Sequence, residues 1–231
     1  MANRGLRIGV IDADIQSPGI HVLFGLRGDD ITVSLNDYLW GRTSITETAR
    51  QVYSSESGGA IFLIPASMKT NEIVQILRQG YDIRRLTEAF RELTQALNLD
   101  ATLIDTHPGL NEETLFSLAI STAVVMVLRP DQQDYEGTGV AVEVARSLDV
   151  PKLVLVVNKA PRSLDPVALK EQVEKTFQCT VGAVLSHSDE MMALGSAAVF
   201  VRRYPDDPIT RALEGVVDLI LAAEPEPARD G

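Results

Sequence analysis

Carboxylates follow two short apolar segments of this sequence, and they are the side chains best suited to chemistry. Asp12 and Asp14 come directly after the segment 6–11, and Asp105 comes directly after 101–104. If both segments are strands of an open parallel sheet, their carboxyl ends meet at the edge where ligands bind. Such carboxylates can hold a metal ion through water or orient a nucleophilic water. The pattern predicts a site for a magnesium-bound nucleotide or for phosphoryl chemistry.

The residues after each strand end support this prediction to different degrees. Asp105 suits Mg²⁺, a hard ion that prefers oxygen ligands and keeps several waters. Gly109, four residues later, would let a backbone N–H approach a phosphate without a side chain in the way. The alternative is that Asp14, Ser17 and Asp105 only cap the loops that follow the strands.

A third polar strand end carries Asn158 and Lys159 after the apolar segment 152–157. The Asn158 amide both donates and accepts, so it can read a nucleotide base, although an ordinary polar loop explains it equally well. The sequence has three histidines, and their positions match no metal-ligand spacing. Its one cysteine, Cys179, can form no disulfide within the chain and has no motif around it.

These strand ends must be positioned by alternating strands and helices. Continuously apolar segments predict strands covered on both faces, at 6–11, 60–64, 101–104, 123–128, 152–157 and 181–185. Amphipathic segments predict helices at 33–40, 45–53, 70–79, 83–98, 112–120, 135–148, 166–177, 189–197 and 208–222. This alternation predicts an α/β fold with a mainly parallel sheet and helices on both faces.

Composition places this fold in one domain without targeting signals. The chain has 231 residues, of which 45% are hydrophobic, and its net charge is −11. That charge disfavours binding to nucleic acid or to an anionic membrane through bulk electrostatics, although a local basic patch could still exist. No apolar segment approaches the length of a membrane span. We expect a cytoplasmic protein with one domain over residues 1–223 and a disordered tail over 224–231, which is charged and rich in proline.

Taken together, the order of these segments resembles the ParA/MinD family of P-loop ATPases. The resemblance runs from Leu6 to about Leu221. It implies that Asp14 orients the attacking water and that Asp12 contributes on the magnesium side. It also implies that Asp105 binds Mg²⁺ through water, that Gly109 contacts the γ-phosphate, and that Asn158 contacts adenine. In the family, ATP-dependent homodimers position DNA, division proteins or other large cargo.

The sequence departs from the family at one decisive point. No G-x-x-x-x-G-K-[ST] motif occurs in it, so the loop that would cradle the phosphates and hold Mg²⁺ is absent. In the family this loop follows a strand beside the Asp105 strand, and its absence predicts a gap of about 10 Å there. Residues 1–4 read like the tail of the helix after that loop. We therefore expect a start assigned too late or a truncated chain, which alone should not hydrolyse ATP.

Two other functions remain open at this point. The chain could be a homologue that naturally lacks the loop and serves as a partner-binding scaffold, its carboxylates being relics or caps. It could also be a phospho-acceptor receiver domain, because Asp12, Asp14, Asp105 and Lys159 follow a similar order along the chain. Receivers, however, use adjacent acids and have no place for the helices expected between residues 41 and 98.

A C-terminal basic amphipathic helix for membrane binding is not expected here, because residues 218–222 carry no basic face.

Overall fold

The computed structural model describes residues 1–82 and 84–222. The predicted tail over 224–231 therefore lies outside the described residues. The chain divides into two compact units. Unit 1 comprises residues 1–120 and 194–199, and unit 2 comprises residues 121–193 together with those from 200 onward. The prediction of a single domain stays a prediction.

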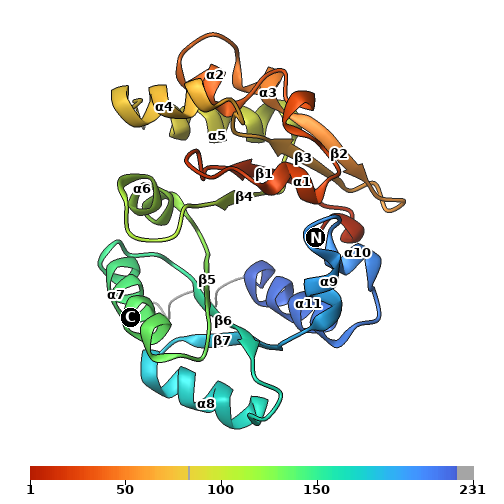
Figure 1. Cartoon of the computed structure of the whole chain (residues 1–231), viewed down its shortest axis with the longest axis vertical. Helices are drawn as coiled ribbons and strands as arrows, with labels where there is room; N and C mark the ends of the chain where they lie inside the picture. Colours follow the sequence, from red (N-terminus) through yellow and green to blue (C-terminus); the bar gives the residue numbers. More distant parts are fainter. Residues whose placement is uncertain (83, 223–231) are drawn as a thin grey trace, which may run out of the picture. The chain divides into compact units, whose positions relative to one another are not determined.

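Unit 1 is built on a four-stranded sheet (Figure 1), and two of its strands end in Asp12 and Asp105. Its strands are β1 (Arg7–Asp12), β2 (Arg50–Ser54), β3 (Ala60–Ile64) and β4 (Ala101–Asp105). They lie in the order β2-β3-β1-β4. β1 pairs in parallel with both β3 and β4, whereas β2 is antiparallel to β3.

The helices α2 to α5 of unit 1 pack on one side of this sheet, where its core forms (Figure 1). The core joins fully buried Ile11 and Ile64 of the strands to Leu35 of α2, Ile45 of α3 and Leu93 of α5. The helical segments of this unit are a 3-10 turn at Ala2–Arg4, α1 (Ile20–Leu23), a 3-10 turn at Gly28–Asp30, α2 (Leu35–Leu39), α3 (Ile45–Thr48), α4 (Thr70–Gln79), α5 (Arg84–Leu97) and α6 (Glu112–Ile120).

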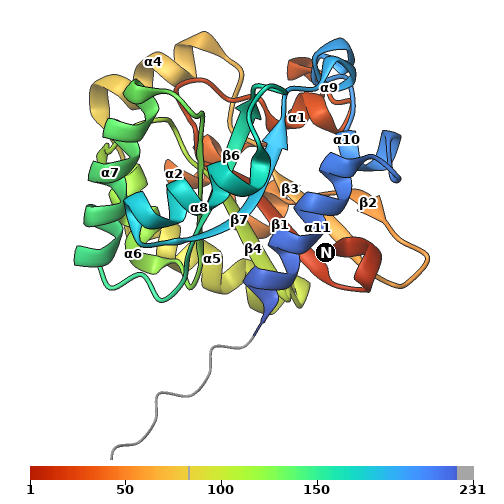
Figure 2. The ribbon, with the colours of Figure 1, turned by 90° about the horizontal axis from the view of Figure 1, so that it is seen from below.

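Unit 2 contains a three-stranded parallel sheet with helices on both faces (Figure 2). Its strands are β5 (Val124–Leu128), β6 (Leu153–Ala160) and β7 (Thr180–Ser186), and its helices are α7 (Gln132–Ser147), α8 (Pro166–Phe177), α9 (Asp189–Leu194), α10 (Phe200–Arg203) and α11 (Pro208–Leu221). Val181 of β7 packs in one core with α7 and α8. The next residue, Gly182, faces Val216 and Leu219 of α11. Because successive residues of a strand point to opposite faces, the two layers of helices cover the sheet from both sides.

The predicted α/β fold is confirmed, and the errors are confined to short elements. The helix predicted over 45–53 is wrong, because α3 ends at Thr48 and the chain continues as β2. Ala49 has an extended backbone, and the turn that returns to β3 passes through Gly58 at φ +88°. Long-range pairing with β3 thus overrides the local helical pattern. The short helix α10 falls between two predicted helices, at a place where the sequence predicted none.

The gap predicted beside the Asp105 strand stays a prediction, but the edges of the two sheets bear on it. Within the described residues, β4 pairs only with β1, and β5 pairs only with β6. Leu103 of β4 is 44% exposed and Val127 of β5 is 62% exposed. Parallel strands of this composition are normally covered on both faces and paired along both edges. Each unit therefore ends in an open apolar strand.

The first residues of the chain form a short 3-10 turn. The turn Ala2–Arg4 is ended by Gly5 in a left-handed conformation, with φ 87°. It packs closely on the β2–β3 turn, where a Cβ on Gly59 would lie only 2.0 Å from the carbonyl oxygen of Ala2. Among the helices described, none combines the length and the apolar character that crossing a membrane requires.

Candidate functional site

The centre of the candidate site is Asp12, the last residue of β1. It is the register partner of Asp105 at the end of β4 and is fully buried, with 0% exposure. Its Oδ2 atom accepts hydrogen bonds from the backbone N–H groups of Gly19 and Ile20, at 3.1 and 3.3 Å. Its Oδ1 atom is buried without a hydrogen-bond partner in the described structure. One half of this carboxylate is therefore fixed by the backbone, and the other half lacks a donor or a cation.

The electrostatics of Asp12 reflect this incomplete pairing. Burial raises the pKa of its carboxyl to about 6, with smaller contributions from the charges of Asp105 and Asp14, although the two backbone N–H donors act in the opposite direction. A buried carboxylate with an unpartnered oxygen costs free energy that a positive charge would offset. The position thus favours a cation nearby.

Asp14 lies in the loop after β1 and links it to the loop after β4. Its Oδ1 atom accepts the backbone N–H of Ser17 at 3.0 Å and lies 3.0 Å from Nδ1 of His107. The two loops are also joined by the backbone, because the N–H of Ala13 donates to the carbonyl of Asp105. The cap predicted for Asp14 and Ser17 is present, and the same carboxylate also contacts a side chain of a second loop.

Asp105 and Gly109 lie where the second strand end enters its loop. Asp105 is exposed on one side, yet the partial burial of its carboxyl, followed by the charge of Asp14, raises its pKa. Gly109 has φ +104°, and nothing lies within 4 Å of the position that a Cβ would take. A side chain at position 109 would thus meet open space, and the contact of Gly109 with a phosphate stays a prediction.

These carboxylates fit a water-coordinated magnesium ion better than a direct protein cage. The unpartnered oxygen of Asp12 and the raised pKa values of Asp12 and Asp105 indicate negative charge that awaits compensation. Over the described residues, however, no group of three or more Asp, Glu, His or Cys side chains has the geometry to hold a metal ion directly. Mg²⁺ keeps several waters and commonly binds one or two carboxylates together with substrate phosphates.

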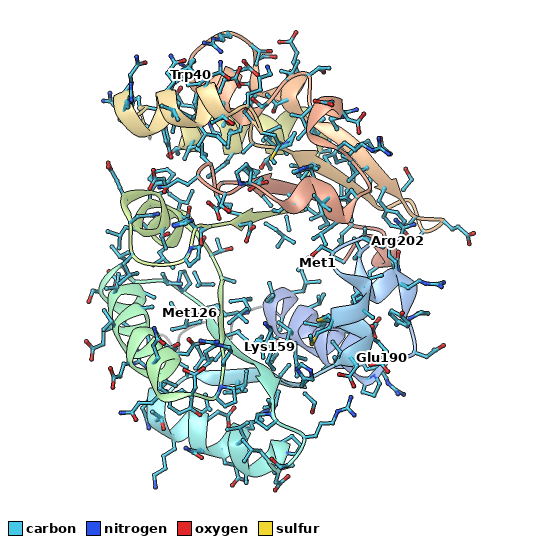
Figure 3. All side chains as sticks on the ribbon, viewed as in Figure 1. Met1, Trp40, Met126, Lys159, Glu190 and Arg202 are labelled. Carbon is cyan, nitrogen blue, oxygen red and sulfur yellow. The ribbon has the colours of Figure 1, made fainter. Side chains whose placement is uncertain are left out.

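Asn158 belongs to unit 2, so it is described apart from the three aspartates of unit 1. It lies at a bulge near the end of β6, and its Oδ1 atom accepts the N–H of Lys159 at 2.9 Å. Lys159, labelled in Figure 3, has a left-handed backbone with φ 53°. The bulge turns the strand end into a polar loop. The N–H of His187 donates to the carbonyl of Ala160 and so joins this loop to the end of β7.

His107 is the residue of this site to which the sequence assigned no role. Its position two residues after Asp105 was visible, but its proximity to Asp14, 93 residues away, depends on the pairing of β1 with β4. Thr114 holds the His107 loop by donating to its backbone carbonyl at 3.1 Å. The one available signal was a histidine in the loop that follows a strand-end aspartate.

Comparison with known proteins identifies the family. A family model described as an AAA domain matches residues 1–149. The chain belongs to the ParA/MinD family of P-loop ATPases. An uncharacterized ATP-binding protein of Methanocaldococcus jannaschii is 22% identical over 229 residues, which cover 98% of this chain and 80% of that protein.

Solved structures agree on the fold of this ParA/MinD chain. The cell division ATPase MinD of Pyrococcus furiosus superposes with a TM-score of 0.78 at 19% identity, covering 95% of this chain and 87% of that one. The septum site-determining protein MinD of Pyrococcus horikoshii, solved in complex with Mg-ADP, gives 0.77 at 17% identity and covers 94% and 84%. This family membership replaces the receiver-domain alternative.

Proposed function

We propose that this chain forms the switch and base-reading parts of an ATPase that positions or partitions cellular cargo. The observation that carries the proposal is the in-register pair Asp12 and Asp105, together with the unpartnered Oδ1 atom of Asp12 and the contact between Asp14 and His107. The MinD relative solved with Mg-ADP supports nucleotide and magnesium as the ligands. The cargo, a homodimer and the cytoplasmic location stay predictions.

In this proposal each residue has one task. Asp14 orients the attacking water, and His107 restrains the Asp14 carboxylate at 3.0 Å. Asp12 and Asp105 would hold a water-coordinated Mg²⁺ ion, which would neutralise the charge of the phosphates. The backbone N–H of Gly109 would donate to the terminal phosphate, and Asn158 would read the adenine amino group and ring nitrogen.

The proposal also explains why this chain alone should be inactive. The sequence contains no Gly-rich phosphate loop with its lysine, and without one the nucleotide phosphates have no cradle. The unpaired edge of β4 supports the idea that a further strand pairs beside Asp105 and delivers that loop. An alternative follows from the same missing motif, namely a partner-binding scaffold that never hydrolyses ATP.

The deciding experiment compares this chain with a version extended by the codons upstream of Met1. We expect the chain alone to show no magnesium-dependent ATP hydrolysis and the extended protein to hydrolyse ATP. In the extended protein, Asp14→Asn should lower kcat by about 10²-fold or more with nucleotide binding retained, because positioned acid–base groups contribute about 10²–10⁴-fold.

The matched control is Asp29→Asn, which removes the same charge from an exposed residue of unit 1 and should leave kcat unchanged. An in-frame stop codon close upstream would favour the scaffold. Hydrolysis by the unextended chain would show that the phosphate cradle is not needed and would overturn this part of the proposal.

A further inference from the structure

A cavity of about 250 Å³ lies in unit 1 beside the loop that carries Asp14. It is smaller than the roughly 300–1,000 Å³ typical of sites for drug-sized ligands, so it suits one small group. Residues from four parts of the unit line it: the loop after β1, the end of α4 with the segment after it, the loop after β4, which contributes His107, and the start of α6. The argument rests on six of them, Ile15, Gln16, Ile76, Tyr81, Glu112 and Glu113.

Two of these side chains bring negative charge to the cavity. Glu112 and Glu113 are the first two residues of α6. Neither forms an ion pair with any residue in the part of the chain that the structure describes. Two uncompensated carboxylates at a partly enclosed surface attract a cation.

A buried hydroxyl without a partner points to the same kind of ligand. The Tyr81 hydroxyl oxygen is buried and makes no hydrogen bond in the described structure, although it lies close to the Glu113 carboxylate. Burial, followed by the charges of Glu113 and Glu112, raises the pKa of this phenol. The phenol therefore stays neutral, so its O–H is placed to donate to the Glu113 carboxylate while its oxygen can still accept from a ligand. Leaving such a group unsatisfied is costly, so a donor is expected at this position.

The remaining lining residues define the shape of the ligand. Ile15 and Ile76 are almost fully buried, with 4% and 5% exposure, and they supply an apolar wall. The side-chain amide of Gln16 adds a further acceptor. We propose that the cavity binds a guanidinium or ammonium group on a short aliphatic stem. The group would come either from a small molecule or from an arginine or lysine side chain of a partner protein.

Binding can be measured on the whole chain without nucleotide, so the outcome does not depend on the proposed ATPase function. We would titrate ¹⁵N-labelled chain with propylguanidinium and with propylurea, which has nearly the same shape but no charge. Propylguanidinium should shift the amide signals of Gln16, Tyr81 and Glu113 in a saturable manner. Propylurea should bind roughly tenfold more weakly or not at all, because hydrogen bonds to charged groups are the stronger ones. Equal binding of the two probes, or shifts located elsewhere, would overturn the proposal.

Variants show which side chains make the site. Glu113→Gln should weaken propylguanidinium binding roughly tenfold, and Tyr81→Phe should weaken it a few-fold. Glu171→Gln, an equal charge change at an exposed position of α8, should have no effect. If Glu113→Gln does not fold, Glu112→Gln provides the same test. Unchanged affinity in the folded glutamine variants would contradict the assignment.

A second pair of probes distinguishes the two sources of the group. Agmatine represents a free small molecule, and a capped tripeptide with a central arginine represents a protein side chain. Tighter binding of agmatine would support a small-molecule ligand, and tighter binding of the tripeptide would support a partner's side chain. Failure of both to bind would overturn the proposal.

Discussion

The two sheets of this protein end in chemically different ways, although both follow the parallel α/β pattern. In unit 1, β1 and β4 end in regular register at Asp12 and Asp105, and burial raises the pKa of both carboxyls. In unit 2, β6 ends in a bulge with Asn158 and Lys159, and the backbone of Lys159 is left-handed. The unfavourable free energy thus comes from buried charge at the first edge and from backbone strain at the second.

Helix starts show a similar contrast. In unit 2, Asp131, Asp165 and Asp207 each accept a backbone N–H of the first turn directly. In unit 1, the short helices instead have a first-turn acid that reaches back, as Glu47 does to the N–H of Ser44 at 3.0 Å. The longer helices of unit 2 thus have direct caps, and the short helices α2 and α3 of unit 1 have reciprocal caps. The comparison shows that the energetically unfavourable groups at a strand end are side chains in one sheet and backbone in the other.

The largest expected effect tests the buried charge. The pKa of the Asp12 carboxyl is about 6 in the folded protein, compared with an ordinary value of 3.8. Because the folded state binds the proton more tightly, this group favours folding below about pH 4, and that contribution is lost as the pH rises to about 6. Asp12→Asn should raise the free energy of unfolding at pH 8 by about 1–3 kcal/mol. The variant should also show a weaker dependence of that free energy on pH between about pH 4 and 6. Urea denaturation in magnesium-free buffer measures both.

The control Asp29→Asn should keep the pH dependence of the wild-type protein. If Asp12→Asn also keeps that dependence, the buried charge of Asp12 does not distinguish the two sheets.

A smaller effect tests the direct caps of unit 2. Asp165 accepts the N–H groups of Val167 and Ala168 at the start of α8. Asp165→Ala should lower the free energy of unfolding by about 1 kcal/mol, because two first-turn donors lose their acceptor. Asp165→Asn keeps the acceptor and should change stability by only a few tenths of a kcal/mol. If both variants behave alike in urea denaturation, the side-chain cap does not distinguish the two units.

The smallest effect tests the strained backbone. Lys159 has φ 53°, a conformation that glycine adopts without cost. Lys159→Gly should therefore raise the free energy of unfolding by about 0.5–1 kcal/mol. Lys170→Gly, in the middle of α8, should lower it by about 1 kcal/mol, which controls for the loss of a lysine side chain. A loss of stability in Lys159→Gly would show that the bulge is not strained.

The sequence by itself determined the alternation of strands and helices, because continuously apolar strands and amphipathic helices are local patterns. It also located Asp12, Asp105 and Asn158, since the end of an apolar segment is visible without any tertiary contact. It misjudged β2, whose strand state comes from pairing with β3 rather than from its own composition.

Only the tertiary structure decided which of these groups meet. The contact between Asp14 and His107, the unpartnered oxygen of Asp12 and the cavity at Tyr81 join segments from far apart in the chain. Such contacts depend on strand order and register, and burial acts on a carboxylate only after those are fixed. The open edge of β4 belongs to the same class, because a missing motif is visible in the sequence but an unpaired strand is not.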